Sequence, residues 1–274
     1  MGCLNSRGQF QHWFSNIHFS GPCNRSCYFC IGQHMMALDS YNNLAQWPLD
    51  GIDQFVASVL EKNCREVYLT GTNTDPSLYK HIPELRQYLK DRIPGLLFGM
   101  RTNGVNLDSK LAALFDRISV SFHSTNPAIY KAMLGGEMPS IGNIVEACKD
   151  ADLLFYIVLG PENKHRITEE VAAMAKAGVK KINIREPYGQ PHVGNPLDYL
   201  APSGERFGGP VYFIHGVEVM YWDVHYTEVE SINLYANGHV STTYPVTRGH
   251  DFDKGSVNGQ EAFFKSGRVR EQWL

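Results

Sequence analysis

Three closely spaced cysteines are the residues of this sequence best suited to chemistry. Cys23, Cys27 and Cys30 follow the pattern Cys-x3-Cys-x2-Cys, and the aromatic residue Phe29 stands directly before the third cysteine. Thiolates at this spacing can ligate three irons of a [4Fe–4S] cluster, whose fourth iron would then have no protein ligand. An open coordination position can bind a substrate or a cosubstrate. The triplet therefore predicts a cluster that takes part in a reaction.

The residues alone leave other uses of the cysteines open. The spacing i, i+4, i+7 also fits one face of a buried helix, although Gly21 and Pro22 directly before the triplet disfavour a helix there. Together with His34, the three cysteines could form a Cys3His zinc site. A third alternative is an electron-transfer cluster with a distant fourth ligand such as Cys64.

Composition narrows the class of protein. The chain has 274 residues, of which 43% are hydrophobic, and its formal net charge is −3. This length suits one large domain or two small ones with an ample core. No run of Lys and Arg is long enough for a nucleic-acid track, which argues against DNA or a large RNA as substrate.

The same composition predicts where the protein works. No stretch approaches the ~20 apolar residues of a membrane span, and the first residues lack the apolar region of a signal peptide. Six cysteines in a chain of this length do not resemble a disulfide framework. We therefore expect a cytoplasmic protein that has no membrane partner.

Hydrophobic periodicity predicts repeated strand-then-helix units. Strands are expected at residues 16–20, 65–70, 96–101, 117–122, 153–159 and 181–185, and helices at residues 51–62, 78–91, 109–115, 141–150 and 168–177. Six such steps with short connections imply a parallel sheet with right-handed crossovers. Six steps rather than eight predict an α/β fold with an open, partial (β/α)6 TIM-like barrel.

A different pattern begins after Arg185. Residues 186–210 are rich in proline and glycine and lack periodicity, which fits either a surface loop or a lid over the barrel mouth. Residues 211–229 alternate like strand, and Asn237-Gly238 is a strong hairpin signal. We expect a partial barrel in residues 1–186, and in residues 187–274 a lid loop with a β-rich C-terminal extension that closes the barrel.

In parallel α/β folds, ligands bind at the carboxyl ends of the strands. This rule places the cysteine loop, residues 23–30, at the barrel mouth. Polar and small residues that can hydrogen-bond an amine, a carboxylate or hydroxyls are expected beside it. They lie at residues 71–75, 102–103, 121–124, 159–160 and 185–186.

With this placement, the cysteine motif resembles that of the radical S-adenosylmethionine (radical SAM) superfamily. The resemblance covers about residues 16–186. It implies that the open iron chelates the amino and carboxylate groups of SAM, and that one electron cleaves SAM to methionine and a 5′-deoxyadenosyl radical. That radical would abstract a hydrogen atom from the substrate, which requires a closed, dry pocket beside the target C–H bond.

The resemblance also assigns roles to individual residues. Cys23, Cys27 and Cys30 would ligate the cluster, and Phe29 would pack near adenine. The superfamily commonly has Gly-Gly-Glu to receive the SAM amino group, but this chain has Gly71-Thr72-Asn73-Thr74. Thr72, Asn73 or Thr74, or backbone carbonyls, would have to replace the Glu. Further contacts with the ribose, carboxylate or adenine of SAM are expected from Asn103, Ser121, Leu159 and Ile184.

His123 and Arg185 are the candidates for substrate contact and catalysis. His123 follows Ser121 by two residues and so can face the mouth. The guanidinium of Arg185 suits a carboxylate or a phosphate, although an ion pair with Glu186 or Asp75 is the alternative. Weaker candidates are Tyr188, His192, Arg248 and His250.

No cysteine follows Cys148, so a single cluster is expected. The sequence therefore predicts a radical SAM enzyme with one [4Fe–4S] cluster, acting on a small-molecule or nucleotide-like substrate. Its electron donor would be a protein such as flavodoxin or ferredoxin. One alternative is a glycyl-radical-enzyme activating enzyme, which acts on a protein. The other is a non-catalytic zinc or electron-transfer iron–sulfur protein.

Overall fold

The structure is a computed structural model. It describes residues 3–4, 10–11, 13–34, 41–187, 194–206, 209–222 and 230–242. Contacts divide the chain into two compact units. Unit 1 comprises residues 1–22, 31–98 and 228–274, and unit 2 comprises residues 23–30 and 99–227. The domain boundary expected after residue 186 stays a prediction.

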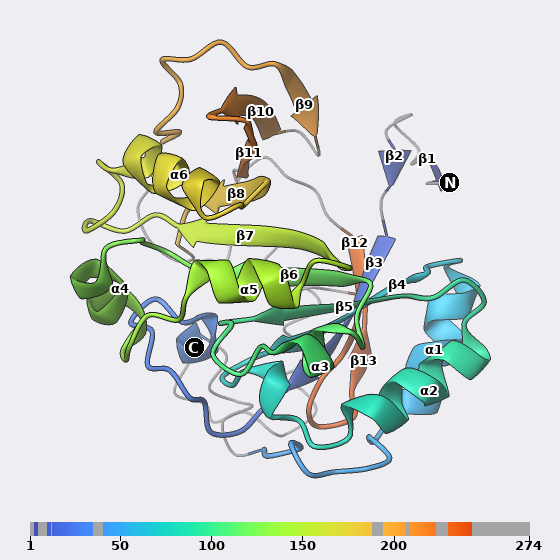
Figure 1. The fold of residues 1–274 in the computed structure, drawn as a ribbon. Coiled ribbons are helices and arrows are strands. Elements are labelled where there is room, and N and C mark those ends of the chain that lie inside the picture. Colours follow the sequence, from blue (N-terminus) through green and yellow to red (C-terminus); the bar gives the residue numbers. More distant parts are fainter. Residues whose placement is uncertain are drawn as a thin grey trace. The chain divides into compact units, whose positions relative to one another are not determined.

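Unit 1 is built on parallel strands with helices beside them (Figure 1). Its strand order is β13-β12-β3-β4, in which β12, β3 and β4 run parallel and β13 is antiparallel to β12. The strands are β3 (Trp13–Phe19), β4 (Glu66–Gly71), β12 (Glu230–Leu234) and β13 (Val240–Ser241). The helices are α1 (Ile52–Glu61), α2 (Ile82–Arg92) and the short 3-10 helices η1 (Ile31–His34) and η3 (Pro76–Leu78). A separate antiparallel pair joins β1 (Cys3–Leu4) and β2 (Phe10–Gln11).

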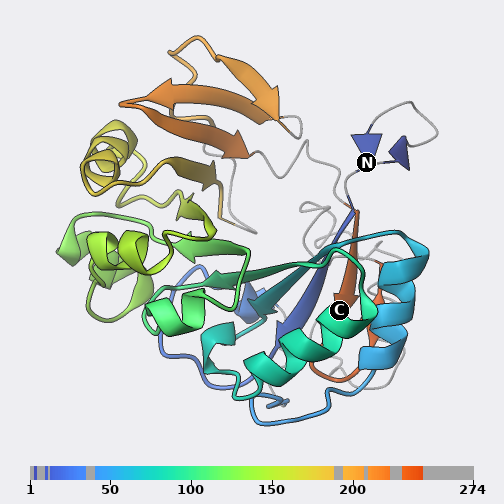
Figure 2. The same ribbon diagram turned by 45° about the vertical axis from the view of Figure 1, so that its right-hand side comes forward.

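Unit 2 follows the order β5-β6-β7-β8-β11-β10-β9, and β5 to β8 and β11 are parallel. The strands are β5 (Leu97–Thr102), β6 (Arg117–Ser121), β7 (Asp152–Val158), β8 (Lys181–Arg185), β9 (Gly204–Arg206), β10 (Gly209–Ile214) and β11 (Val217–Trp222). The helices are α3 (Ser109–Ala112), α4 (Pro127–Leu134), α5 (Ile141–Ala147) and α6 (Ile167–Lys176). The antiparallel strands β9 to β11 form a β-rich layer next to β8 (Figure 2).

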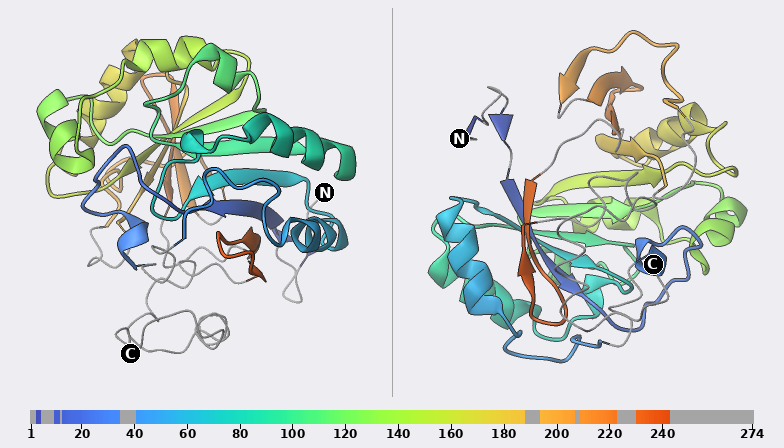
Figure 3. Two further views of the ribbon diagram at one scale, coloured as in Figure 1. Left: turned by 90° about the horizontal axis from the view of Figure 1, so that it is seen from below. Right: turned by 180° about the vertical axis from the view of Figure 1, so that it is seen from behind.

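Strands β3 to β8 are the six strands of the predicted β/α steps. The C-terminal extension adds a parallel neighbour to each end strand, because β12 pairs with β3 and β11 pairs with β8. The adjacent course of β3 and β12 is visible in Figure 3. The barrel is therefore open, and the predicted α/β partial barrel with a β-rich C-terminal extension is confirmed. Among the described residues, no helix is long and apolar enough to cross a membrane.

The expected elements differ from the observed ones in identifiable places. Helix α4 was not predicted, although Asn126 caps it by accepting hydrogen bonds from the N–H groups of Ala128 and Ile129, and Pro127 opens its first turn. Residues 211–222 form two strands rather than one, because His215 and Gly216 turn the chain with φ of 53° and 78°. The hairpin expected at Asn237-Gly238 joins β12 to β13.

Alternation along the strands of unit 1 separates an apolar face from a polar one. Ile17, Phe19, Val67, Leu69, Ile232 and Leu234 are fully or almost fully buried. The polar face carries Asn16, His18, Ser231 and Asn233, which are also buried. The Asn233 Oδ1 accepts hydrogen bonds from Asn16 Nδ2 at 2.8 Å and faces His18 Nε2 at 3.2 Å. Buried polar groups need hydrogen-bond partners, and these groups find them on the neighbouring strand. The network therefore helps to join β12 to β3.

We expect Asn233→Ala to lower the free energy of unfolding by about 2–3 kcal/mol, since it removes the acceptor for two buried groups. Chemical denaturation followed by circular dichroism measures this change. Ser58→Ala, which removes a surface hydrogen bond to the Gln54 carbonyl within α1, should cost less than ~0.5 kcal/mol. Equal effects of the two substitutions would contradict a role for Asn233 in joining the strands.

Candidate functional site

The cysteine loop follows β3 and belongs to unit 2. Cys23 is exposed, Cys27 and Cys30 are half-buried, and none of the three forms a disulfide. The Cys30 N–H donates to the Cys27 carbonyl at 3.2 Å, which closes a turn between these two residues. The loop thus holds three cysteines without a disulfide, and their role as cluster ligands stays a prediction.

Burial and mutual repulsion disfavour the thiolate form of this loop. Burial raises the pKa of Cys27 to about 12, and the charges of Cys30 and Cys23 add to the rise. A positively charged group bound between the sulfurs would offset both effects, because metal ligation deprotonates thiols. The donor set thus fits an iron–sulfur cluster.

The zinc alternative requires ligands that meet at one ion. Among the described side chains, no three His, Cys, Asp or Glu residues converge on a single-ion site. The ligands of a [4Fe–4S] cluster bind separate irons and need not meet at one ion. The side chain of His34, the fourth ligand of the zinc alternative, lies outside the described residues.

Neighbouring loops of unit 2 hold the cysteine loop. Asn103, directly after β5, donates from Nδ2 to Asn24 Oδ1 at 2.6 Å. The Tyr28 hydroxyl donates to Glu162 Oε2 at 2.8 Å. The ring of Phe29 meets His123 edge-on, with 4.9 Å between centroids. Of these residues, the sequence did not single out Asn24 and Glu162. Glu162 follows β7 at the strand end that the barrel rule marks for ligands.

His123 is buried and fixed in one tautomer. Its Nδ1 accepts a hydrogen bond from the Val158 N–H at 3.0 Å, so the proton of the neutral ring lies on Nε2. Burial, with a smaller contribution from the charge of Arg185, lowers the pKa of His123 to about 3. A neutral imidazole is not available as a proton donor of ordinary strength at neutral pH. Its predicted contact with substrate stays a prediction.

Arg185 is exposed at the end of β8, with its guanidinium 5.3 Å from the centroid of the Tyr156 ring. Within the described part of the chain it forms no ion pair. Glu186, one of the expected partners, instead accepts hydrogen bonds from Gly194 N–H at 2.7 Å and the Tyr221 hydroxyl at 3.0 Å. Arg185 is therefore available for an anionic ligand.

Strand alternation places several predicted residues on opposite faces of unit 2. Ser121, Tyr156 and Asn183 pair across β6, β7 and β8, and they share one face with Arg185. The Asn183 Oδ1 on this face is buried without a hydrogen-bond partner. Ile184 lies on the other face, and both it and Leu159 are fully buried. Their expected contacts with adenine stay predictions, as do those of Ser121 and Asn103 with SAM.

In unit 1, the loop after β4 is held against the chain that leads into the cysteines. This β4 loop, residues 71–75, contains the residues predicted to replace the Gly-Gly-Glu motif. Asn73 Oδ1 accepts from Ser20 Oγ at 2.8 Å and from Gly21 N–H at 3.1 Å. Thr74 Oγ1 donates to the Pro22 carbonyl at 2.6 Å. The residue bonded to Cys23 is thus fixed by the β4 loop.

The chain that leaves the cysteine loop meets the same residues. A Cβ on Gly32 would lie 2.6 Å from the Thr72 carbonyl oxygen and 2.8 Å from Asn73 Cα, so only glycine fits there. A Cβ on Gly71 would overlap the Thr74 carbonyl, which explains the glycine at the start of the β4 loop. Thr72 Oγ1 is buried and has no hydrogen-bond partner among the described residues.

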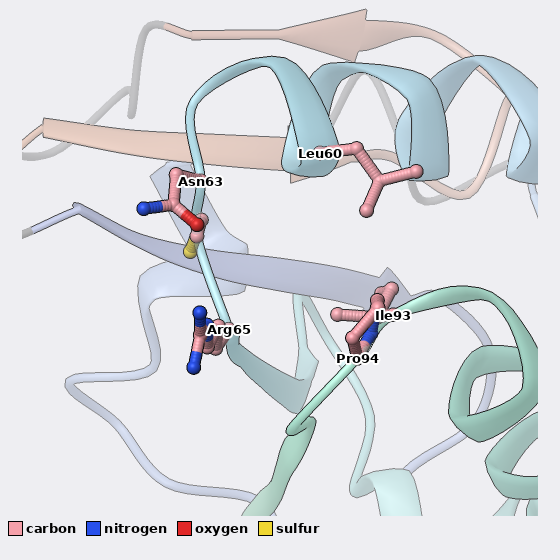
Figure 4. A pocket seen from close by; sticks show the side chains of 6 residues that line it. Leu60, Asn63, Arg65, Ile93 and Pro94 are labelled. Carbon is pink, nitrogen blue, oxygen red and sulfur yellow. The ribbon is translucent and has the colours of Figure 1, made fainter.

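Cys64, considered above as a fourth cluster ligand, lies at the amino end of β4. It lines a pocket with Leu60, Asn63, Arg65, Ile93 and Pro94 (Figure 4). The six residues of β4 separate Cys64 from the β4 loop that holds Pro22, a span of roughly 20 Å at ~3.3 Å per residue. Burial also raises the pKa of this thiol. Both observations disfavour Cys64 as a ligand. Tyr188, His192, Arg248 and His250 lie outside the described residues.

We expect the His123 imidazole to stay neutral down to about pH 4, with its proton on Nε2, because burial dominates its pKa. Below about pH 6.5 the unfolded chain binds a proton that the folded chain rejects, so stability falls with falling pH by up to ~1.4 kcal/mol per unit. His123→Gln should flatten this dependence between about pH 6.5 and 4.5. NMR titration and denaturation at several pH values measure both effects. A His123 resonance that titrates near the unfolded value would refute the assignment.

The sequence profile of the Radical SAM superfamily matches residues 17–174. A probable GTP 3',8-cyclase of Sulfolobus acidocaldarius is 27% identical over 180 residues, which cover 62% of this chain and 54% of that protein. A probable GTP 3',8-cyclase of Methanococcus vannielii is 30% identical over 136 residues, which cover 47% of this chain and 43% of that protein. The chain thus spans about half the length of the curated relatives it matches.

Solved structures agree on the fold. Streptococcus suis SuiB bound to S-adenosylmethionine is 10% identical and superposes with a TM-score of 0.58, covering 86% of this chain and 61% of SuiB. A further SuiB structure gives a TM-score of 0.56 at 9% identity, covering 96% of this chain and 65% of SuiB. Because the family profile spans more than half of its length, with the cysteine motif inside the match, this chain belongs to the radical SAM superfamily of enzymes.

Proposed function

We propose that the protein binds one [4Fe–4S] cluster through Cys23, Cys27 and Cys30 and uses it with SAM to generate a substrate radical. The observation that carries this proposal is the cysteine loop itself. It holds three cysteines that form no disulfide, and along the chain it is flanked by Pro22 and Gly32, which both lie against the β4 loop. Such fixation supports cluster binding, because ligands held in place before binding lose less entropy on binding.

Within the β4 loop, we assign the SAM amino group to Thr72. The carbonyl oxygen of the Asn73 side chain already accepts two hydrogen bonds, and the Thr74 hydroxyl already donates to Pro22. Thr72 Oγ1 is buried without a partner, and a buried polar group without a partner is destabilising until a ligand supplies one. An ammonium group donates hydrogen bonds, and the hydroxyl oxygen of Thr72 can accept one of them.

Bound at these residues, the cluster would supply the electron that cleaves SAM into methionine and a 5′-deoxyadenosyl radical. The residues of the chain would contribute positioning and exclusion of water. Phe29 and His123 form an apolar contact beside the cysteines, and the neutral state of His123 keeps a charge out of that contact. A primary carbon radical needs such surroundings, because water and misplaced C–H bonds divert it.

The substrate we propose is a small, nucleotide-like molecule that carries an anionic group. The curated relatives are named GTP 3',8-cyclases, which supports a nucleotide-like substrate at low identity. The proposal that the substrate carries an anionic group is supported by Arg185. Its guanidinium is exposed and forms no ion pair with a described residue. The proposed electron donor is a protein such as flavodoxin or ferredoxin, and the proposed location is the cytoplasm.

The central test is Cys27→Ala. Anaerobic reconstitution should load about four irons into the wild-type chain, and reduction in the presence of SAM should yield 5′-deoxyadenosine detectable by mass spectrometry. Cys27→Ala should lose both the cluster and the product, because one of three ligands is missing. Cys148→Ala, at a buried free cysteine outside the loop, should retain both. Formation of 5′-deoxyadenosine by Cys27→Ala, or stoichiometric zinc in the wild type, would contradict the proposal.

Thr72→Val tests the assignment of the SAM amino group. Removing one hydrogen bond to a charged donor should raise the Kd of SAM by about tenfold. It should not lower the Tm of the SAM-free protein, because the hydroxyl has no partner there. Thr74→Val is the matched control, and it should lower the Tm by releasing Pro22. Equilibrium dialysis measures the Kd of SAM, and differential scanning calorimetry measures the Tm of each variant. Unchanged SAM binding in Thr72→Val would contradict the assignment.

A further inference from the structure

A short segment at the end of α4 binds the cysteine loop within unit 2. This clamp loop, residues 134–137, lies one element beyond the end of β6 and has no part in the motifs discussed above. The Leu134 carbonyl accepts from the Ser26 N–H at 2.9 Å. The Glu137 carbonyl accepts from Arg25 Nη2 at 2.6 Å. Two main-chain acceptors therefore hold two successive residues of the cysteine loop.

Two glycines allow the clamp loop to lie close to the cysteine loop. Gly135 ends α4 with φ 66° and ψ 109°, and Gly136 has φ 112°, a region that other residues rarely adopt. A Cβ on Gly135 would lie 2.0 Å from Ser26 Oγ, and a Cβ on Gly136 would lie 2.4 Å from Arg25 Nη1. A side chain at Gly135 would have to displace the Ser26 hydroxyl, and a side chain at Gly136 would have to displace the Arg25 guanidinium that binds the Glu137 carbonyl.

The clamp acts on residues that lie between two of the cluster ligands. Arg25 and Ser26 connect Cys23 to Cys27 along the chain, so their position sets how these two thiols are presented. Cys27 itself lies against the clamp, with its Sγ 3.9 Å from the Leu134 carbonyl oxygen. The guanidinium of Arg25 also lies 5.9 Å from the centroid of the Tyr130 ring on α4, and Tyr130 is fully buried. The loop is thereby tied to the core of unit 2.

We propose that the clamp loop positions Cys23 and Cys27 for cluster binding, with Gly135 and Gly136 as residues that must stay small. This inference rests on the proposed function, because it concerns the same three ligands. Gly135, Gly136 and Arg25 are positioning residues that act through the main chain of the cysteine loop. Their loss lowers retention of the cluster, and the fold is kept.

Gly135→Ala is the first test, with the rate of iron release to a chelator from the reconstituted protein as the readout. The substitution should raise this rate by roughly tenfold or more, the ratio that corresponds to ~1.4 kcal/mol. Gly216→Ala is the matched control, because Gly216 has φ 78° and no atom within 4 Å of its added Cβ. It carries the same backbone strain without touching the cysteine loop, and it should release iron at the wild-type rate.

A double substitution separates the clamp from general destabilisation. Ser26→Ala removes the atom that a Gly135 side chain would strike, and the Ser26 N–H bond to Leu134 remains. The double variant Ser26→Ala with Gly135→Ala should therefore recover most of the iron retention that Gly135→Ala loses, and Ser26→Ala alone should behave as the wild type. Absence of recovery would show that backbone strain, and not the clamp, explains the single variant.

Arg25→Gln tests the second contact and stays interpretable if Gly135→Ala fails to fold. It removes the bond to the Glu137 carbonyl and should speed iron release several-fold, with the Tm of the iron-free protein unchanged. Glu146→Gln is its control, because Glu146 is an exposed carboxylate on α5 that pairs with Lys149 and lies outside the clamp loop. Wild-type iron release in both Arg25→Gln and Gly135→Ala would overturn the clamp. A wild-type chain that takes up no cluster would instead overturn the proposed function.

Discussion

Burial at Cys27 is the constraint on which the rest of the proposed site depends. Burial alone disfavours the charged form of Cys27, and its two neighbouring thiolates disfavour it further, so that its pKa rises to about 12. A loop free to move would let the sulfurs separate, and a cluster would then have to gather them at an entropic cost. The fold instead holds the loop in place through contacts that involve residues beside the cysteines.

Within each compact unit, contacts hold residues that lie in or beside the cysteine loop along the chain. In unit 1, the β4 loop fixes Pro22 before the first cysteine and packs against Gly32 after the last. In unit 2, main-chain and side-chain groups hold residues 24–29 between the ligands. The β4 loop follows a strand that pairs in parallel with β3, the strand that leads into the cysteines. The middle of the cysteine loop depends on contacts particular to this chain.

Sequence periodicity was sufficient for the parts of the fold that are locally encoded. The strand predicted at residues 181–185 has the bounds of β8, because Ile182 and Ile184 alternate there with polar residues. The pairing of β12 with β3 could not be foreseen, since more than 200 residues separate them and the sequence carries no signal for long-range partners. The α4 helix was missed even though Asn126-Pro127 is a recognisable start. The same holds for the candidate site. The spacing of the cysteines is visible in the sequence, but the choice of Thr72 over Asn73 for the SAM amino group depends on the hydrogen bonds of the structure.

The charge that remains near the cysteine loop in unit 2 suits hydrogen-atom transfer better than proton transfer. His123 is the ring in contact with Phe29, and it is held neutral by burial and by the positive charge of Arg185. A neutral imidazole whose Nδ1 is occupied by a backbone N–H offers no proton acceptor on that side. Abstraction of a hydrogen atom by a carbon radical moves a proton and an electron together and needs no general base. A neutral His123 and an Arg185 that forms no ion pair with a described residue are compatible with the radical step and the anionic substrate proposed above.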